Sequence, residues 1–201
     1  MKNKIFNKII TIIKKNNNDI NDEQLEIVLY GLESIYLTMT KIVVILILSY
    51  LMGIFKEAIY TLFFYNFIRL FAFGMHAKKS SQCLIFSLIF FVFVPYIVSI
   101  IYISPLIKII CSIVAFILII IYAPADTEKR PLINKKKRIR FKILSIICSF
   151  VLLVLIFLYK DYEISSYMFL GFIDGCIVIL PITYKMFGLS YNNYKTYKEV
   201  W

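Results

Sequence analysis

The chain has 201 residues, of which 61% are hydrophobic, and its mean hydropathy is +0.81. An ordinary globular protein is roughly 45 to 50% apolar, so this composition excludes a water-soluble fold. The formal charge of +11 would suggest nucleic acid in a soluble protein. Here the lysines and arginines lie mainly between apolar runs, which is typical of membrane topology and of contacts with anionic lipid. The sequence predicts an all-α, polytopic membrane helical bundle.

Residues 1–15 predict a basic amphipathic helix on the membrane surface, because their apolar residues recur at near-helical spacing between lysines. No small-residue cleavage site follows an uninterrupted apolar core, so a cleaved signal peptide is not expected. The polar run at 16–23 reads as a linker that offers caps for a helix beginning near Gln24.

Six apolar segments are predicted to cross the bilayer, since a spanning helix needs about 20 mostly apolar residues. The second is the weakest, because it is short and contains Asn66 and Arg69, which are costly inside lipid. We expect one membrane-embedded domain over 1–201, with its transmembrane bundle at 35–187 and a polar tail at 188–201. The segments are 35–55, 58–73, 84–103, 106–122, 143–159 and 165–187.

The basic residues predict the orientation. If all six segments cross, most lysines and arginines fall on one side, in the N-terminal helix, the breaks at 76–82 and 126–142, and the tail. Only Lys56, Lys108 and Lys160 lie at the opposite ends of the segments. The positive-inside rule then places both termini in the cytoplasm, and it requires the weak second segment to cross.

The one histidine, His76, lies seven residues before Cys83, which begins the third segment. A cysteine nucleophile needs a base to form its thiolate, and histidine is the usual one. An unbroken helix would separate the two side chains by about 10 Å along its axis, so the chain must turn between them. If Ser80 or Ser81 caps the third segment, Cys83 falls in its first turn, where the helix dipole favours thiolate. The alternative is an interfacial histidine and a cysteine that merely starts a span.

A second run, at 122–132, ends the fourth segment at a pair of prolines. Its plain interpretation is a helix stop followed by a basic cytoplasmic loop. Asp126 in this run could orient His76, pair with Arg69 or bind a basic part of a substrate.

The two runs together resemble those of the accessory gene regulator B (AgrB) family, membrane cysteine endopeptidases of Gram-positive peptide quorum sensing. The resemblance extends over essentially the whole chain. It departs at Phe73, where the first of two adjacent glycines is expected and where a ring restricts the turn before His76. The matching residues are Arg69, Gly74, His76, Ala77 and Cys83 in the first run, and Tyr122, Ala123, Pro124, Ala125, Asp126 and Thr127 in the second.

The resemblance implies a propeptide substrate of the AgrD kind. His76 would deprotonate Cys83, which would attack the carbonyl before an acidic C-terminal tail and form a thioester. The precursor's own cysteine would then displace Cys83 and close a thiolactone ring. The expected supporting residues are Arg69, Gly74, Gln82, as an oxyanion donor, and Asp126.

The central basic run is the expected contact for the acidic tail of the substrate. The resemblance also implies a homodimer in the cell membrane with its active site at the cytoplasmic side, and neither a metal, another cofactor nor nucleic acid is expected. The candidate tail-binding residues are Lys129, Arg130, Lys135, Lys136, Lys137 and Arg138.

Two other functions stay open at this point. A small-molecule or ion transporter would use Asn66, Arg69 and Asp174 within its spans, although no inverted repeat is evident. A membrane scaffold or sensor would act through the basic run.

Overall fold

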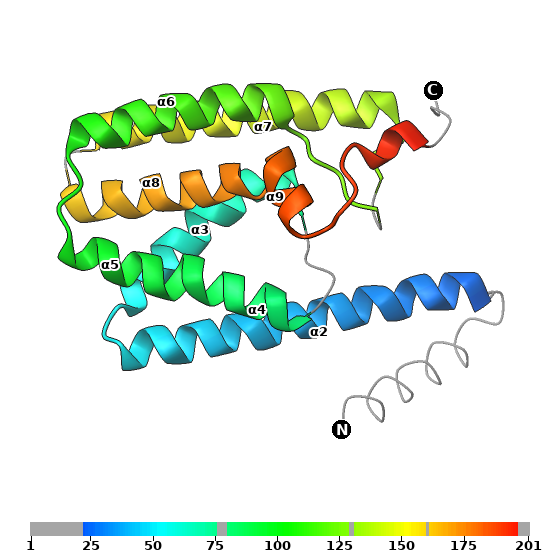
Figure 1. The fold of residues 1–201 in the computed structure, drawn as a ribbon, viewed down its shortest axis with the longest axis horizontal. Coiled ribbons are helices and arrows are strands. Elements are labelled where there is room, and N and C mark those ends of the chain that lie inside the picture. The colour runs from blue at the N-terminus through cyan, green and yellow to red at the C-terminus, as the bar shows by residue number, and fades with distance from the viewer. Residues whose placement is uncertain (1–21, 76–79, 129–130, 160, 197–201) are drawn as a thin grey trace. The chain divides into compact units, whose positions relative to one another are not determined.

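A computed structural model describes residues 22–75, 80–128, 131–159 and 161–196 (Figure 1). The chain divides into two compact units, Met1–Val44 and Ile45–Trp201. The predicted amphipathic helix at 1–15 and the linker at 16–23, except for its last two residues, lie outside the described residues, as does His76.

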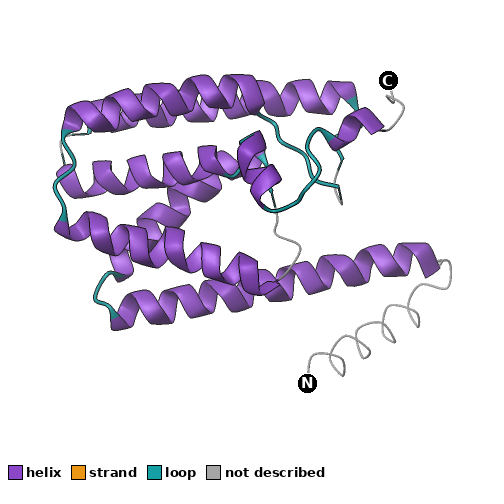
Figure 2. Ribbon diagram, viewed as in Figure 1, coloured by secondary structure: helices purple, strands orange, loops and turns teal. Residues whose placement is uncertain are grey.

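Helices make up most of the described chain, and Figure 2 shows long connections between α6 and α7 and after α9. No strand occurs among these residues, which confirms the all-α prediction. A π-helical turn, η1, separates α4 from α5, and a 3-10 turn, η2, lies in the tail. The elements are α2 (Asp22–Leu51), α3 (Phe55–Ala72), α4 (Ser80–Leu88), η1 (Ile89–Phe93), α5 (Val94–Ile100), α6 (Pro105–Tyr122), α7 (Lys135–Leu158), α8 (Tyr162–Ile177), α9 (Pro181–Met186) and η2 (Asn193–Thr196).

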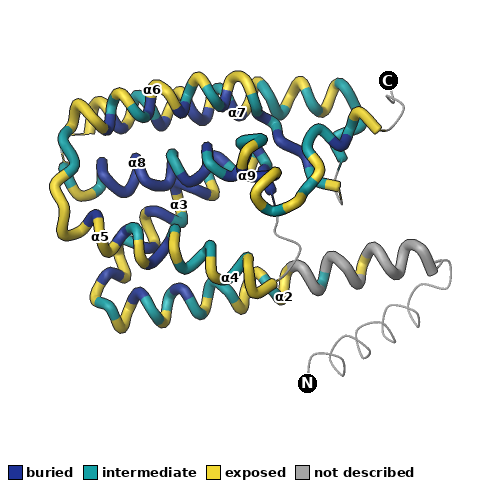
Figure 3. The backbone as a smooth tube through the Cα atoms, viewed as in Figure 1, coloured by how far each residue is buried: buried dark blue, intermediate teal, exposed yellow. Residues whose placement is uncertain are grey.

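Three helical stretches of the described chain are long and apolar enough to cross a membrane, namely Ser80–Ile100, Pro105–Tyr122 and Lys135–Leu158. A shorter apolar stretch covers Ile35–Leu51. Figure 3 shows exposed positions recurring along α6 and α7, and many of them carry large apolar side chains. Such a surface is suited to lipid rather than water. The chain is therefore a membrane protein, while six crossings and their orientation stay predictions.

Two predicted boundaries differ from the structure. The run at 126–142 was expected to be a loop, but α7 already begins at Lys135 because Asn134 caps it, its Oδ1 accepting the Lys137 N–H at 3.0 Å. The sixth segment begins at Tyr162 instead of 165, while the interruption expected at Pro181 is confirmed, since α8 ends at Ile177 and a short α9 begins at Pro181.

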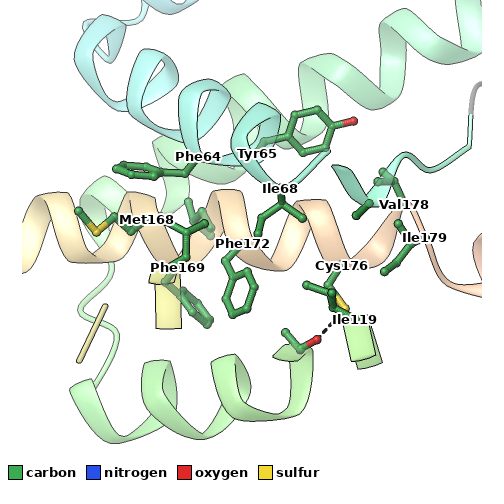
Figure 4. Packing of buried hydrophobic residues seen from close by; sticks show 14 of the residues in the cluster. Phe64, Tyr65, Ile68, Ile119, Met168, Phe169, Phe172, Cys176, Val178 and Ile179 are labelled. Carbon is green, nitrogen blue, oxygen red and sulfur yellow. Dashed lines mark hydrogen bonds between the residues drawn. The ribbon is translucent and has the colours of Figure 1, made fainter. Parts of the chain in front are cut away.

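The core of the unit Ile45–Trp201 is centred on α8, whose buried side chains lie between α3 and α6 (Figure 4). Helices α3 and α8 approach to backbone contact at Gly171, where an added Cβ would lie 2.7 Å from the Tyr65 nitrogen. On the other side of α8, Cys176 Sγ donates to the Ala115 carbonyl at 3.7 Å, the dashed line in Figure 4. This packing aligns the ends of α3, α6 and α8.

Candidate active site

One end of this unit is organised by the segment that follows α3. The Ala125 N–H donates to the Ala72 carbonyl at 2.9 Å, and the Gly74 N–H donates to the Ala125 carbonyl at 3.0 Å. The Met75 N–H then donates to the Val178 carbonyl at 2.9 Å. The chain leading to His76 is thus fixed between the ends of α6 and α8. We call this region, residues 72–75, 123–126 and 177–180, the Ala125 end.

The backbone at Phe73 and Gly74 explains why glycines belong in this turn. Phe73 has φ 60° and ψ −127°, a conformation that an L side chain rarely adopts. Gly74 has φ 119°, and a Cβ there would lie 2.9 Å from Cγ2 of Val178. The Phe73 ring packs edge-on against Phe141 with centroids 4.8 Å apart. The ring that replaces the expected glycine therefore has a packing partner on α7.

Substitutions at Phe73 test this backbone strain. Phe73→Ala and Phe73→Gly both lose the contact with Phe141, but only glycine adopts φ 60° freely. We expect the Gly variant to be more stable than the Ala variant by about 1–3 kcal/mol, the reverse of the usual order. Thermal unfolding of the two variants in detergent measures the difference. Equal stabilities would show that the backbone at position 73 is not strained.

Arg69 ties helix α3 to the segment just before His76. Its Nη2 donates to the Met75 carbonyl at 3.0 Å, and its Nη1 donates to the hydroxyl of Tyr65 one turn earlier on α3. Sequence reasoning singled out Arg69 but missed Tyr65, although a spacing of four residues on a helix brings two side chains to the same face. Arg69 therefore helps to define where the chain leaves α3.

Cys83 lies in the first turn of α4 and is partly buried. Its thiol is close enough to the Tyr65 hydroxyl for the two groups to interact electrostatically. Farther along α4, the Phe86 ring packs against Phe187, with centroids 4.5 Å apart. Gln82, the candidate oxyanion donor, is exposed beside Cys83. The roles predicted for Cys83, His76 and Gln82 in catalysis stay predictions.

Asp126 is 3% exposed and anchors the C-terminal tail. Its Oδ1 accepts the Asn193 N–H at 2.9 Å, and its Oδ2 accepts the N–H groups of Tyr194 at 2.8 Å and Leu132 at 3.2 Å. The Tyr184 hydroxyl donates to the backbone carbonyl of Asp126 at 2.9 Å. The carboxylate thus has a structural task that no local sequence pattern indicated, because two of its partners are more than 60 residues away.

Tyr191 is a second point at which the C-terminal tail is attached. Its hydroxyl donates to the Tyr122 carbonyl at 3.3 Å, and its ring packs edge-on against Tyr184. Burial raises the pKa of Tyr191 to about 12, with the nearby Tyr122 as a smaller cause. The phenol therefore stays protonated, and able to donate, at any physiological pH.

Some basic residues of the central run precede α7, and others lie on the first turn of this helix. Lys136 and Lys137 are exposed on its first turn, and Lys135 is partly buried. The Arg138 guanidinium lies over the Tyr194 ring, 3.9 Å from its centroid. Lys129 and Arg130 lie outside the described residues. Within the described ranges, no group of three or more His, Cys, Asp or Glu side chains is placed to hold a metal ion.

The family model described as "Accessory gene regulator B" matches residues 6–183. The chain belongs to this family. A "Putative AgrB-like protein" of Clostridium acetobutylicum is 30% identical over 98% of this chain and 96% of that protein. The "Accessory gene regulator protein B" of Staphylococcus aureus is 34% identical over 90% of this chain and 94% of that protein.

A further "Putative AgrB-like protein", from Listeria innocua, is 30% identical over 84% of this chain and 83% of that protein. No solved structure matches the chain significantly. The resemblance carried by the two sequence motifs is thereby confirmed, and membership supports a role in the accessory gene regulator quorum-sensing system.

Proposed function

We propose that the protein is a membrane cysteine endopeptidase that removes the C-terminal tail of an AgrD-like propeptide and promotes formation of its thiolactone ring. The observation that carries the proposal is the position of Cys83 in the first turn of α4, within electrostatic range of Tyr65, whose partner Arg69 holds the chain just before His76. Family membership supports the same substrate system.

In this mechanism His76 takes the proton of Cys83 Sγ, and the thiolate attacks the carbonyl that precedes the tail of the propeptide. The free amides and the dipole at the start of α4 favour the thiolate. The tail leaves as an amine after His76 returns the proton, and the rest of the propeptide stays on Cys83 as a thioester.

The thiolate of the propeptide's own cysteine then attacks this thioester. Its sulfur forms the ring, and the sulfur of Cys83 leaves as thiolate and is reprotonated. One thioester replaces another, so the exchange is nearly isoenergetic. Departure of the tail and exclusion of water from the acyl-enzyme therefore determine the yield of ring over hydrolysed product.

Charge supports the mode of substrate recognition. Lys136 and Lys137 are exposed at the start of α7 and would attract an acidic tail. With the positive-inside bias of the sequence, they favour cleavage at the cytoplasmic face. A homodimer in the cell membrane completes the proposal.

A trapped intermediate tests the function directly. Purified protein is incubated with a propeptide whose ring-forming cysteine is replaced by serine, which slows release of the acyl group. We expect mass spectrometry to find the truncated propeptide attached to Cys83 through a bond that hydroxylamine cleaves. Cleavage without any adduct, or an adduct on Cys111 instead, would contradict the mechanism.

The contacts in the structure do not favour a transporter. Asn66 Nδ2 donates to the Leu62 carbonyl of its own helix at 2.7 Å. Arg69 is engaged by Tyr65 and the Met75 carbonyl, and Asp174 is 3% exposed. None of these three side chains lines the cavity formed by Tyr102, Lys108 and Tyr162.

A further inference from the structure

A cavity of about 250 Å³ lies at the end of the unit Ile45–Trp201 opposite to the Ala125 end. It is formed where α6 and α8 begin and α7 ends, and its walls include Tyr102, Lys108, Phe157, Tyr159, Tyr162 and Ser165. A liquid water molecule occupies about 30 Å³, so the cavity has room for a polar group of several heavy atoms. Nothing in the proposed peptidase mechanism uses it.

Lys108 brings a buried positive charge to this cavity. Its side chain is 3% exposed, and Nζ donates to Ser165 Oγ at 3.2 Å and to Ser166 Oγ at 3.3 Å. Nζ also lies 4.5 Å from the centroid of the Tyr162 ring. No carboxylate in the described ranges forms an ion pair with it. A buried charge without a counter-ion is costly, so the site gains most from an anion.

The serine hydroxyls are arranged to hold an ammonium group. Ser166 donates its own proton to the Tyr162 carbonyl at 2.7 Å, and Ser165 donates to the Ile156 carbonyl at 3.4 Å. Each therefore offers Lys108 only a lone pair. An ammonium group has three donors, and the serines accept two of them. In the described residues no further oxygen accepts from Nζ, and only the Tyr162 ring lies beside it, so the third donor is accessible to a ligand.

Two tyrosine rings form part of the cavity wall. The Tyr162 hydroxyl accepts the Ile103 N–H at 2.6 Å and donates to the Ile101 carbonyl at 3.3 Å. The Tyr102 ring stacks on Tyr162, with centroids 4.8 Å apart and planes 15° apart. Tyrosines are enriched at the membrane–water interface, so this pair of rings suits a cavity at headgroup depth.

The surface around the opening is apolar and exposed. Leu106 is 65% exposed, Phe157 66% and Leu158 63%. These side chains continue onto the exposed faces of α6 and α7, which are suited to acyl chains. A free anion would make no contact with this apolar surface. A lipid would contact the surface with its acyl chains while its phosphate enters the cavity.

We propose that this cavity binds the headgroup of an anionic glycerophospholipid, with Lys108 pairing with its phosphate oxygens. Phosphatidylglycerol suits the site better than phosphatidylcholine, because choline would bring a second positive charge toward Lys108. The Pro105 turn, which starts α6, points its free backbone amides toward the same end and adds to the attraction for an anion.

Lipid binding to purified protein in detergent tests the proposal. Native mass spectrometry measures the bound fraction against phosphatidylglycerol concentration for the wild type, Lys108→Met and Lys56→Met. We expect Lys108→Met to weaken binding about tenfold or more, since one charge-assisted hydrogen bond is worth that much. Lys56→Met, which removes an exposed lysine, should bind like the wild type. Equal weakening by both variants, or none by Lys108→Met, overturns the proposal.

Two further binding measurements distinguish between the possible ligands. Phosphatidylcholine should bind less tightly than phosphatidylglycerol, because its choline adds a positive charge near Lys108. Inorganic phosphate at millimolar concentration should not displace the lipid. Displacement by phosphate would make this a site for a free anion, and equal binding of both lipids would remove the role of headgroup charge, so either result overturns the proposal.

A measurement on the wild type keeps the proposal testable if Lys108→Met does not fold. Phosphatidylglycerol carrying a photoreactive headgroup is bound, irradiated and digested. We expect labelling in the stretches 101–109, 156–159 and 162–166, which contain the residues that line the cavity. Labelling confined to other parts of the chain would refute the site.

Discussion

Replacing Cys83 by alanine is expected to abolish cleavage of a coexpressed propeptide while the protein still folds and accumulates in the membrane. Loss of a nucleophile lowers the rate of a protease by about 10⁶-fold, and alanine leaves only a small void at this partly buried position. Immunoblotting of a tagged propeptide measures cleavage, and a tag on the protein itself measures its abundance. Serine at position 83 should be almost as inactive, because its hydroxyl is a much weaker nucleophile than a thiolate at neutral pH.

The matched control is Cys111→Ala, since Cys111 is likewise a partly buried cysteine but lies on α6. This variant should cleave like the wild type. Cleavage that survives Cys83→Ala but is lost in Cys111→Ala would refute the proposed nucleophile. A transporter or a scaffold would be indifferent to both substitutions, so unchanged cleavage in both variants would argue for one of those functions.

Hydrophobic runs alone predicted most of the helices. Segments 106–122 and 84–103 correspond closely to Pro105–Tyr122 and Ser80–Ile100. The start of α7 was placed too late, because an apolar pattern does not detect a basic first turn that a single asparagine caps. The π-helical turn before α5 was also missed. It lies next to Pro95, which lacks the N–H that a regular helix would use there.

In the candidate site, too, some residues could be predicted from the sequence and others could not. A local motif was enough to select Cys83, Arg69 and Gly74, and to mark Phe73 as the departure whose backbone is strained. Contacts between distant segments carry no such signal. Lys108 was counted only as a topological charge, and its burial became visible only when α8 was packed beside α6. Residues that act through tertiary contacts therefore needed the structure.

The second large effect is expected at Asp126, whose replacement should weaken the attachment of the C-terminal tail. Asp126→Ala removes the acceptor of three backbone N–H groups, each bond to a charged group being worth about 1.5–3 kcal/mol. Water solvates part of the released tail, so we expect a net loss of about 3 kcal/mol, or roughly 100-fold in the population of detached tail. The rate of chymotrypsin cleavage after Tyr194 is measured in detergent by mass spectrometry. This rate should rise by the same factor if the tail detaches and reattaches faster than the protease cuts it.

Asp126→Asn gives a graded result, because it fills the same space but sets an NH₂ group against a backbone donor. The carboxamide oxygen can still accept from Tyr194 and Leu132, which share Oδ2 in the wild type, but the N–H of Asn193 loses its acceptor. Its cleavage should accelerate less than that of Asp126→Ala. Glu128→Gln, at an exposed position of the same loop, should leave the rate unchanged. If Asp126→Ala is cut no faster than Glu128→Gln, the tail is held by its other contacts, of which Arg138 over Tyr194 is the first to test.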